Sequence, residues 1–277
     1  MTAYPLTELR ARIEEELTAH PHLQAIRAYN CAMVGELGKA CNLPGAKMLD
    51  LGASVHGYAL EAALGQGVRA YEGIDLDIGR HWSVDAVEFA RPGGGIGRLR
   101  EMNAEGLEFE NDTFDCLLSI STFEHFLRPK VVLAEMHRVL RGGGVALLSF
   151  EPVWTCAYGH HLHHFGAVSE LVPPWSHLFL DEARMRGVLE RSAWPADAPL
   201  TVEDALRWIF HESGINRLDL RQLRNICEES AFEVSWVCPL ADEAEERRAL
   251  ADYVSRLTIY DPQELLTRGL SVLLRKQ

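Results

Sequence analysis

The fold is decided by the stretch Lys47-Met-Leu-Asp50-Leu-Gly52-Ala-Ser-Val-His-Gly57 together with Tyr71-Glu-Gly73-Ile-Asp75-Leu-Asp77. The first piece predicts a short buried strand, a turn that contains glycine and the start of a helix at Tyr58. The second piece predicts another strand, which ends in carboxylates. A strand–turn–helix–strand unit of this kind places a ligand against its turn and an acidic residue near a ribose.

Two residues of this unit carry the ligand-binding expectation. Gly52 lets the backbone turn tightly and approach a ligand, because glycine has no Cβ. Asp75 can accept hydrogen bonds from both hydroxyls of a ribose, and Asp77 takes that role if the strand ends two residues later. The third glycine of a nicotinamide-binding G-x-G-x-x-G is missing. An ordinary α/β turn without a ligand remains the alternative for this motif alone.

The order Asp50-x-Gly52-x-Ser54-x-His56-Gly57 resembles the Asp/Glu-x-Gly-x-Gly-x-Gly signature of class I S-adenosylmethionine-dependent methyltransferases. It departs from that signature because Ser54 replaces the second glycine and His56 replaces the last one. Further along, Phe-Asp at 114–115, Glu-His at 124–125 and Arg-Val-Leu at 138–140 are similar to later motifs of the same family. The series runs in the correct order from about residue 46 to 151, and it is closest in type to the type 11 methyltransferases.

This resemblance implies a doubly wound, mostly parallel α/β sheet of seven strands. It implies that S-adenosyl-L-methionine is the cofactor and S-adenosyl-L-homocysteine the product. The implied cofactor-binding residues are Asp50, Gly52 and Ala53 at the methionine end, Asp75 at the ribose, Leu76, Asn103 and Ala104 around the adenine, and Ser119 to His125 beneath the reacting methyl.

The chain divides into four segments. Residues 1–45 predict helices, which either cover the cofactor or pack on the sheet edge. Residues 46–151 form the cofactor-binding core, in which the glycine-rich run at 91–97 is expected to link a helix to a strand. Residues 152–217, rich in His, Trp and Pro, predict a substrate-binding cap, because an insertion after the fifth strand begins where ligands bind in open α/β sheets. Residues 218–277 complete the sheet with an antiparallel pair.

Histidines are the candidate general bases. Methyl transfer to a hydroxyl requires positioning and removal of a proton, and an imidazole with its ordinary pKa of about 6.5 suits that task. His125 follows Glu124 at the end of the fourth strand. His160, His163 and His164 share one face if their segment is helical. A loop-bracing Glu-His pair and a polar cavity lining are the alternatives.

A metal-dependent mechanism is a separate hypothesis. Glu124, His125 and one or two of the later histidines can ligate a divalent ion that binds substrate hydroxyls. A similar Glu-x-x-Glu-His arrangement occurs in the small-RNA 3′-end methyltransferases, but Ser121 stands where their first glutamate stands. Base catalysis without a metal and simple proximity remain open beside it.

Charge, hydropathy and cysteine content indicate which substrates and which cellular compartment to expect. The formal net charge is −13 with no evident basic face, which disfavours a nucleic-acid substrate. No apolar run approaches the roughly 20 residues of a membrane span, and no signal sequence begins the chain, so we expect a cytoplasmic protein. The six cysteines contain no C-x-x-C pair, and we expect no disulfide framework.

Together these features favour methyl transfer to a small-molecule or glycan acceptor, at oxygen, in specialised or glycan metabolism. Two other classes remain: an enzyme that uses the cofactor for a different reaction, and a binding subunit whose site has decayed. The retention of Asp50, Gly52, Asp75 and Asn103 argues against the binding subunit. The sequence specifies neither the acceptor nor the oligomeric state.

Overall fold

The computed structural model describes residues 2–211 and 214–277, apart from the side chains of Thr2, His163, His164, Ala167 and Trp236–Cys238. The described residues form a nine-stranded sheet in the order β1-β4-β5-β3-β2-β6-β7-β9-β8. The strands are β1 Thr2–Pro5, β2 Lys47–Leu51, β3 Ala70–Asp75, β4 Ala86–Ala90, β5 Ile96–Glu101, β6 Phe114–Ile120, β7 Leu140–Phe150, β8 Glu233–Ala241 and β9 Thr267–Arg275. The five strands from β5 to β7 are parallel, and β8 and β9 pair antiparallel, as the sequence predicts.

The expected number of seven strands is wrong, because β1 and β4 extend one edge of the sheet. β4 occupies a segment that was expected to be helical, and its Val87 and Phe89 are buried with the period of two that a strand produces. The run at 91–97 is therefore a hairpin between β4 and β5, not a link from a helix. Its tight reversal uses Gly93, Gly94 and Gly95, all with positive φ.

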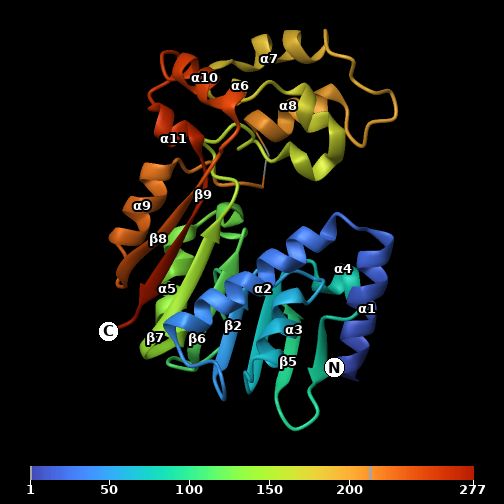
Figure 1. The fold of residues 1–277 in the computed structure, drawn as a ribbon, viewed down its shortest axis with the longest axis vertical. Coiled ribbons are helices and arrows are strands. Elements are labelled where there is room, and N and C mark those ends of the chain that lie inside the picture. The colour runs from blue at the N-terminus through green and yellow to red at the C-terminus, as the bar shows by residue number, and fades with distance from the viewer. Residues whose placement is uncertain (1, 212–213) are drawn as a thin grey trace.

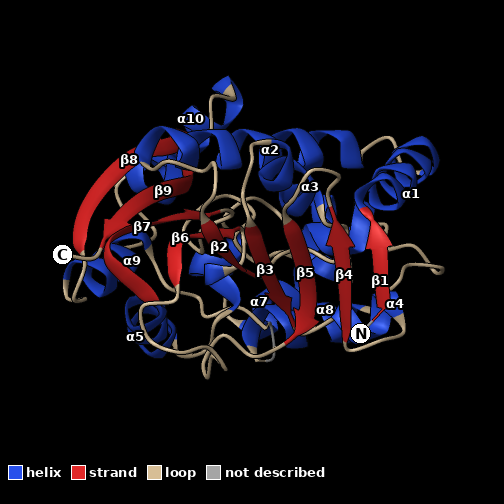
Figure 2. Ribbon diagram, turned by 90° about the horizontal axis from the view of Figure 1, so that it is seen from below, coloured by secondary structure: helices blue, strands red, loops and turns tan. Residues whose placement is uncertain are grey.

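Helices cover both faces of the sheet (Figure 2). One face carries α1 Leu6–Ala19, α2 Leu23–Ala40 and α3 Tyr58–Gly65, and the other carries α5 Pro129–Val139 and α9 Leu220–Glu228. Successive residues of a strand point to opposite faces: Met48 of β2 packs in the core of the first face and Leu49 in the core of the second. α2 runs unbroken through Gly35 and Gly38, and α4 Ile78–Trp82 is a short helix near β4.

A helical cap lies beyond the carboxyl ends of the parallel strands (Figure 1). It contains η2 Leu162–Leu171, α6 Ser176–Phe179, α7 Glu182–Leu189, α8 Val202–Phe210, α10 Glu245–Val254 and α11 Pro262–Leu266. α8 begins with a capping box, in which Thr201 and Asp204 each accept a hydrogen bond from the other's backbone N–H. Leu206 belongs to a hydrophobic cluster of the cap that is separate from the two cores of the sheet.

The cap is built from two segments of the chain. Besides residues 152–217, it takes α10 and α11 from the connection between β8 and β9. Ala251 and Leu265 of that connection pack with Trp175 of the first segment. Among the described residues, no helix has both the length and the apolar character that crossing a bilayer requires.

Candidate active site

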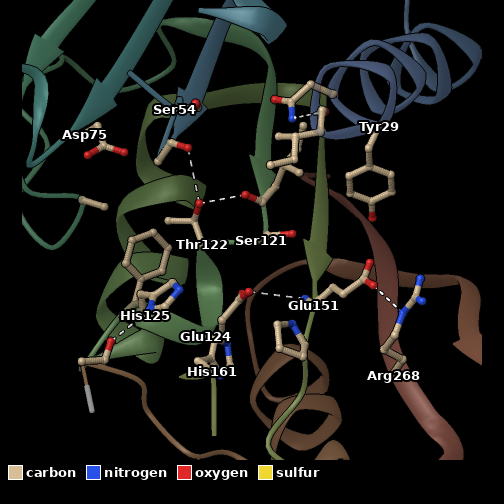
Figure 3. Close-up of a pocket in the computed structure, with 18 of the residues that line it drawn as sticks. Tyr29, Ser54, Asp75, Ser121, Thr122, Glu124, His125, Glu151, His161 and Arg268 are labelled. Atoms are coloured by element: carbon tan, nitrogen blue, oxygen red, sulfur yellow. Dashed lines mark hydrogen bonds and ion pairs between the residues drawn. The ribbon is translucent and has the colours of Figure 1, made fainter. Parts of the chain in front are cut away.

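A cavity of about 1350 Å³ opens where the parallel strands end (Figure 3). Each of the five parallel strands contributes the residue that ends or follows it: Gly52, Asp75, Met102, Ser121 and Glu151. The cap and α2 close the other sides. Sites for one small ligand usually enclose about 300–1,000 Å³, so this cavity has room for a cofactor and an acceptor together.

Gly52 forms the turn at the end of β2. Its φ is 71°, and its N–H and that of Ala53 both donate to the carbonyl of Ile74, at 2.8 and 3.0 Å. A Cβ at Gly52 would overlap the side chain of Thr122. Glycine is therefore required here both by the left-handed backbone and by the close approach of a neighbouring loop.

Asp75 places a carboxylate at the end of β3. Its Oδ1 accepts a hydrogen bond from the backbone N–H of Asp77 at 3.0 Å, and burial raises the pKa of this carboxyl. The Asp77 side chain is instead 55% exposed and pairs with Arg80 at 2.9 Å. Both carboxylates line the cavity, but Asp75 is the more buried of the two and is held by a backbone hydrogen bond, which favours it for the ribose.

The remaining predicted cofactor residues at this end also line the cavity. Leu76 is 66% exposed and offers an apolar face, and Ala104 is buried beside it in the lining. The side-chain oxygen of Asn103 accepts from the N–H of Glu105 at 2.9 Å, so its amide nitrogen is oriented as a donor. An apolar surface beside an amide suits a purine, and a buried carboxylate suits a diol, so these residues fit the nucleoside that the resemblance implies.

Four predicted site residues do not line the cavity: Asp50, Ala53, Ser119 and His160. Asp50 lies beneath the Gly52 turn, where it accepts a hydrogen bond from the Tyr71 hydroxyl and burial raises its pKa to about 7. Ala53 and Ser119 are buried in the sheet layer. Their position supports the floor of the site, and a direct contact of Asp50 with a cofactor stays a prediction.

A short helical turn, η1 Phe123–His125, brings Glu124 and His125 to the cavity. Glu124 is buried, one of its oxygens accepts from the Glu151 N–H at 3.4 Å, and burial raises its pKa to about 8. The Nδ1 of His125 lies 3.0 Å from the carbonyl of Gly214, and burial lowers the pKa of this imidazole. Both groups therefore favour their uncharged forms near neutral pH.

The chain that leaves the cap holds this turn in place. Asn216 donates from its side chain to the carbonyls of Phe123 and Phe126, at 2.9 and 3.1 Å. Its backbone N–H donates to the carbonyl of Glu124 at 2.7 Å. The position of η1 thus depends on residues about ninety positions later in the chain, since Asn216 and Gly214 grip it directly.

The histidine-rich segment contributes His161 to the cavity, a residue that sequence reasoning did not select. His161 has a φ of 60°, and its Nδ1 lies 2.5 Å from the carbonyl of Gly159. The expected helical face does not form with His160, because His160 lies in a turn before η2 and is fully buried away from the cavity. The side chains of His163 and His164 lie outside what the structure describes. The run of histidines at 160–164 indicated that this segment belongs to the site. Which imidazole lines the cavity depends on the backbone turn before η2, which the sequence pattern does not specify.

Glu124, His125 and His161 converge. One ligand atom from each lies within 4.8 Å of the other two. The rings of His125 and His161 meet edge to face with their centroids 5.3 Å apart. This is the grouping that the metal hypothesis anticipates, with His161 as the later histidine.

The far side of the cavity is polar and was not predicted. The hydroxyl of Tyr29 lies 2.5 Å from Ser149 Oγ, and Glu151 pairs with Arg268 at 2.5 Å (Figure 3). Arg247, paired with Asp242, lies over the ring of Tyr158 at 5.0 Å. These residues come from distant parts of the chain, so no local motif announces them. Their charges are mutually paired, which leaves this side polar without a strong net charge.

Comparison with known proteins identifies the core. Residues 49–148 match the family model described as a methyltransferase domain. An uncharacterized methyltransferase of Mycobacterium avium (strain 104) is 35% identical over 140 residues, which cover 50% of this chain and 53% of that protein. One from Mycobacterium tuberculosis (strain ATCC 25618 / H37Rv) is 30% identical over 141 residues, again 50% of this chain and 53% of the relative. The chain thus spans about half the length of the curated relatives it matches.

Solved structures of similar arrangement share little sequence. The YcgJ protein from Bacillus subtilis has a TM-score of 0.48 at 14% identity, covering 89% of this chain and 99% of that one. Phosphoethanolamine N-methyltransferase 2 of Haemonchus contortus, solved with S-adenosyl-L-methionine, has a TM-score of 0.48 at 16% identity, covering 90% of this chain and 53% of that one.

Proposed function

We propose that this chain, whose residues 49–148 match a methyltransferase domain, is a class I S-adenosylmethionine-dependent methyltransferase that transfers a methyl group to an oxygen atom of a small-molecule or glycan acceptor. The observation that carries the proposal is the two-ended cavity. One end presents Asp75 and Asn103 to a nucleoside, and the other presents Glu124 and His125 beneath a helical cap. A single cavity with both ends suits two ligands that must react with each other.

The cofactor end supplies binding and orientation. When bound, S-adenosyl-L-methionine supplies a methyl group activated on a sulfonium. Asp75 would hold the ribose hydroxyls, Leu76 and Ala104 would pack against the adenine, and the Gly52 turn would approach the methionine end. Holding two reactants in line can contribute on the order of 7–11 kcal/mol to catalysis, so positioning alone accounts for a large share of the rate.

The acceptor hydroxyl must also lose its proton. The Gly214 carbonyl can only accept a hydrogen bond, so Nδ1 of His125 donates and its Nε2 carries the lone pair. In our proposal the acceptor oxygen bonds to the methyl carbon as the sulfur–carbon bond breaks, and Nε2 of His125 takes the hydroxyl proton. A positioned base of this kind contributes roughly 10²–10⁴-fold.

The class of acceptor follows from the polar side of the cavity. Glu151–Arg268 and Asp242–Arg247 are charge pairs, so the wall offers hydrogen bonds without a strong field of either sign. That wall suits a hydroxylated, uncharged acceptor. A polyanionic nucleic acid fits poorly, because the chain carries a net charge of −13. A place in specialised or glycan metabolism accords with such an acceptor.

A metal-dependent form of the same transfer is the second candidate, favoured by the convergence of Glu124, His125 and His161. A decayed site has less support, since Gly52, Asp75 and Asn103 all lie in the cavity lining. A use of the cofactor for another reaction is separated from methyl transfer by the mass of the product.

Calorimetry and mass spectrometry test the proposal in sequence. We expect the purified chain to bind both S-adenosyl-L-methionine and S-adenosyl-L-homocysteine, and to add one methyl mass to a member of a panel of hydroxylated small molecules and glycans. His125→Ala should lower kcat by roughly 10²-fold or more if it removes the base, while the affinity for S-adenosyl-L-homocysteine remains. A chain that binds neither nucleoside would refute the proposal.

A further inference from the structure

We propose that Glu124, His125 and His161 bind a divalent transition-metal ion and that the ion holds an oxygen atom of the acceptor. The role toward the acceptor rests on the proposed function, whereas the binding of the ion does not. The three side chains come from two separate segments, η1 and the turn before η2, and all three line the cavity.

The donor atoms have the spacing of an almost assembled site. One oxygen and two nitrogens lie within 4.8 Å of one another. Ligand bonds to a zinc ion measure about 2.0–2.2 Å for these donors, so two donors on a tetrahedral ion lie about 3.3–3.6 Å apart. A pair at the 4.8 Å limit would have to approach by about an ångström, which rotation of the side chains can supply.

Both imidazoles are oriented by the backbone. Nδ1 of His125 lies 3.0 Å from the Gly214 carbonyl, and Nδ1 of His161 lies 2.5 Å from the Gly159 carbonyl. A carbonyl oxygen can only accept, so each Nδ1 carries the hydrogen and each Nε2 carries a lone pair. Metal-ligating histidines almost always have this second contact, which fixes the tautomer and the ring orientation.

Glu124 supplies an independent indication of a cation. Its side chain is 5% exposed, and Oε1 accepts one backbone hydrogen bond from Glu151. Oε2 has no hydrogen-bond partner among the described residues. A buried carboxyl oxygen without a partner is costly even in the uncharged form that burial favours. A cation on that oxygen removes the cost, and the nearby Glu151 cannot provide it because it is itself an anion, paired with Arg268.

The donor set selects the kind of ion. Two imidazoles and one carboxylate suit Zn²⁺, Mn²⁺, Co²⁺ or Fe²⁺, whereas Mg²⁺ and Ca²⁺ prefer oxygen donors alone. Three protein ligands leave at least one position open, as in catalytic rather than structural sites.

An ion at this site changes how the acceptor hydroxyl would lose its proton. With Nε2 of His125 on the ion, the imidazole no longer acts as the base. The ion instead lowers the pKa of the acceptor hydroxyl that it holds, and the proton passes to water before or during attack on the methyl carbon.

Metal binding to the untagged full chain tests the site directly. After removal of metals with a chelator, calorimetric titration with Zn²⁺ and Co²⁺ should give one tight site per chain, and Co²⁺ should show visible absorption bands of a nitrogen- and oxygen-bound ion. Changes in groups that merely orient a ligand cost about 10–100-fold in affinity. We therefore expect Glu124→Gln and His161→Asn, which remove ligands, to weaken binding by about 100-fold or more.

The variants are chosen to keep the fold. Glutamine preserves the shape of Glu124, and asparagine tolerates the left-handed backbone of residue 161. His211→Asn is the matched control, because His211 pairs with Glu182 on the exposed side of the cap, outside the cavity lining. It should bind the ion as the unmodified chain does, and circular dichroism should show all three variants folded.

The outcomes separate the two proposals. The metal site is overturned if the unmodified chain binds none of Zn²⁺, Co²⁺, Mn²⁺ and Fe²⁺. It is also overturned if Glu124→Gln and His161→Asn bind the ion as tightly as the unmodified chain does. The same metal-free samples are titrated with S-adenosyl-L-homocysteine. If the chain binds the nucleoside but no ion, the proposed function stands and the metal site is overturned. If it binds the ion but not the nucleoside, the metal site stands and the proposed function is overturned.

Discussion

The two ends of the cavity are built in different ways. At the cofactor end, the functional residues are the first residues after consecutive parallel strands, as with Gly52 after β2 and Asp75 at the end of β3. At the acceptor end, Glu124 and His125 follow β6, but the residues around them come from α2, from the chain after β7, from the cap and from β9. The cofactor end is therefore specified by the sheet itself, whereas the acceptor end exists only when distant segments fold over it.

This difference predicts that cofactor binding can be lost without disturbing the acceptor end. If Asp75 accepts both ribose hydroxyls, Asp75→Ala removes two charge-assisted hydrogen bonds of about 1.5–3 kcal/mol each. The affinity for S-adenosyl-L-homocysteine should fall by about 100-fold or more, measured by calorimetry. Asp77→Ala is the matched control, since the Asp77 side chain is 55% exposed and paired with Arg80, and its backbone N–H still donates to Asp75. Equal losses in both variants would show that Asp75 is not the ribose ligand.

A substitution in the hydrophobic core of the cap should destabilise the acceptor end without weakening cofactor binding. Leu206 is fully buried in the hydrophobic cluster of the cap, so Leu206→Ala should destabilise the cap by about 2–5 kcal/mol. Hydrogen exchange should accelerate in η2, α7 and α8, while the affinity for S-adenosyl-L-homocysteine stays within about twofold. Arg207→Ala on the exposed face of the same helix should leave exchange almost unchanged, because Arg207 pairs with Asp204 at the surface. A parallel loss of nucleoside binding in Leu206→Ala would mean that the two ends are one cooperative unit.

A smaller effect concerns the contact between the two ends at Gly52. A Cβ there would meet Thr122 and would force alanine into a φ of 71°, so Gly52→Ala should lower the free energy of unfolding by about 1–3 kcal/mol. The same substitution at Gly35, in the middle of α2 with open space around it, should raise stability by about 0.5–1 kcal/mol. Urea denaturation measures both. If both variants changed the free energy of unfolding in the same direction, the close approach of Thr122 to Gly52 would be contradicted.

The strand ends at the proposed cofactor end could be predicted from the sequence because their patterns are local, whereas the contacts of Asp75 and Asn103 with a cofactor stay predictions. The buried strands, the glycine turn and the terminal carboxylate each leave a pattern within a few residues, and all of them lie where expected in the fold. Sequence reasoning misjudged the sheet edge, since Val87 and Phe89 are too few to distinguish a short strand from a helix.

At the acceptor end, the same reasoning found the segment but not the residue. Four histidines lie between 160 and 164, and a turn at 158–161 turns His160 inward and His161 toward Glu124. Arg268 and Tyr29 gave no signal, because their role comes from tertiary contacts across more than a hundred residues.

The grip of Asn216 and Gly214 on η1 has a mechanical consequence. These residues lie in the connection by which the chain returns from α8 of the cap to α9. A displacement of the cap that drew this connection away would take the Gly214 carbonyl from Nδ1 of His125 and free the ring to rotate. In the proposed function, the orientation of the imidazole would therefore depend on the position of the cap, so the base would be in place only while the cap is closed over the acceptor.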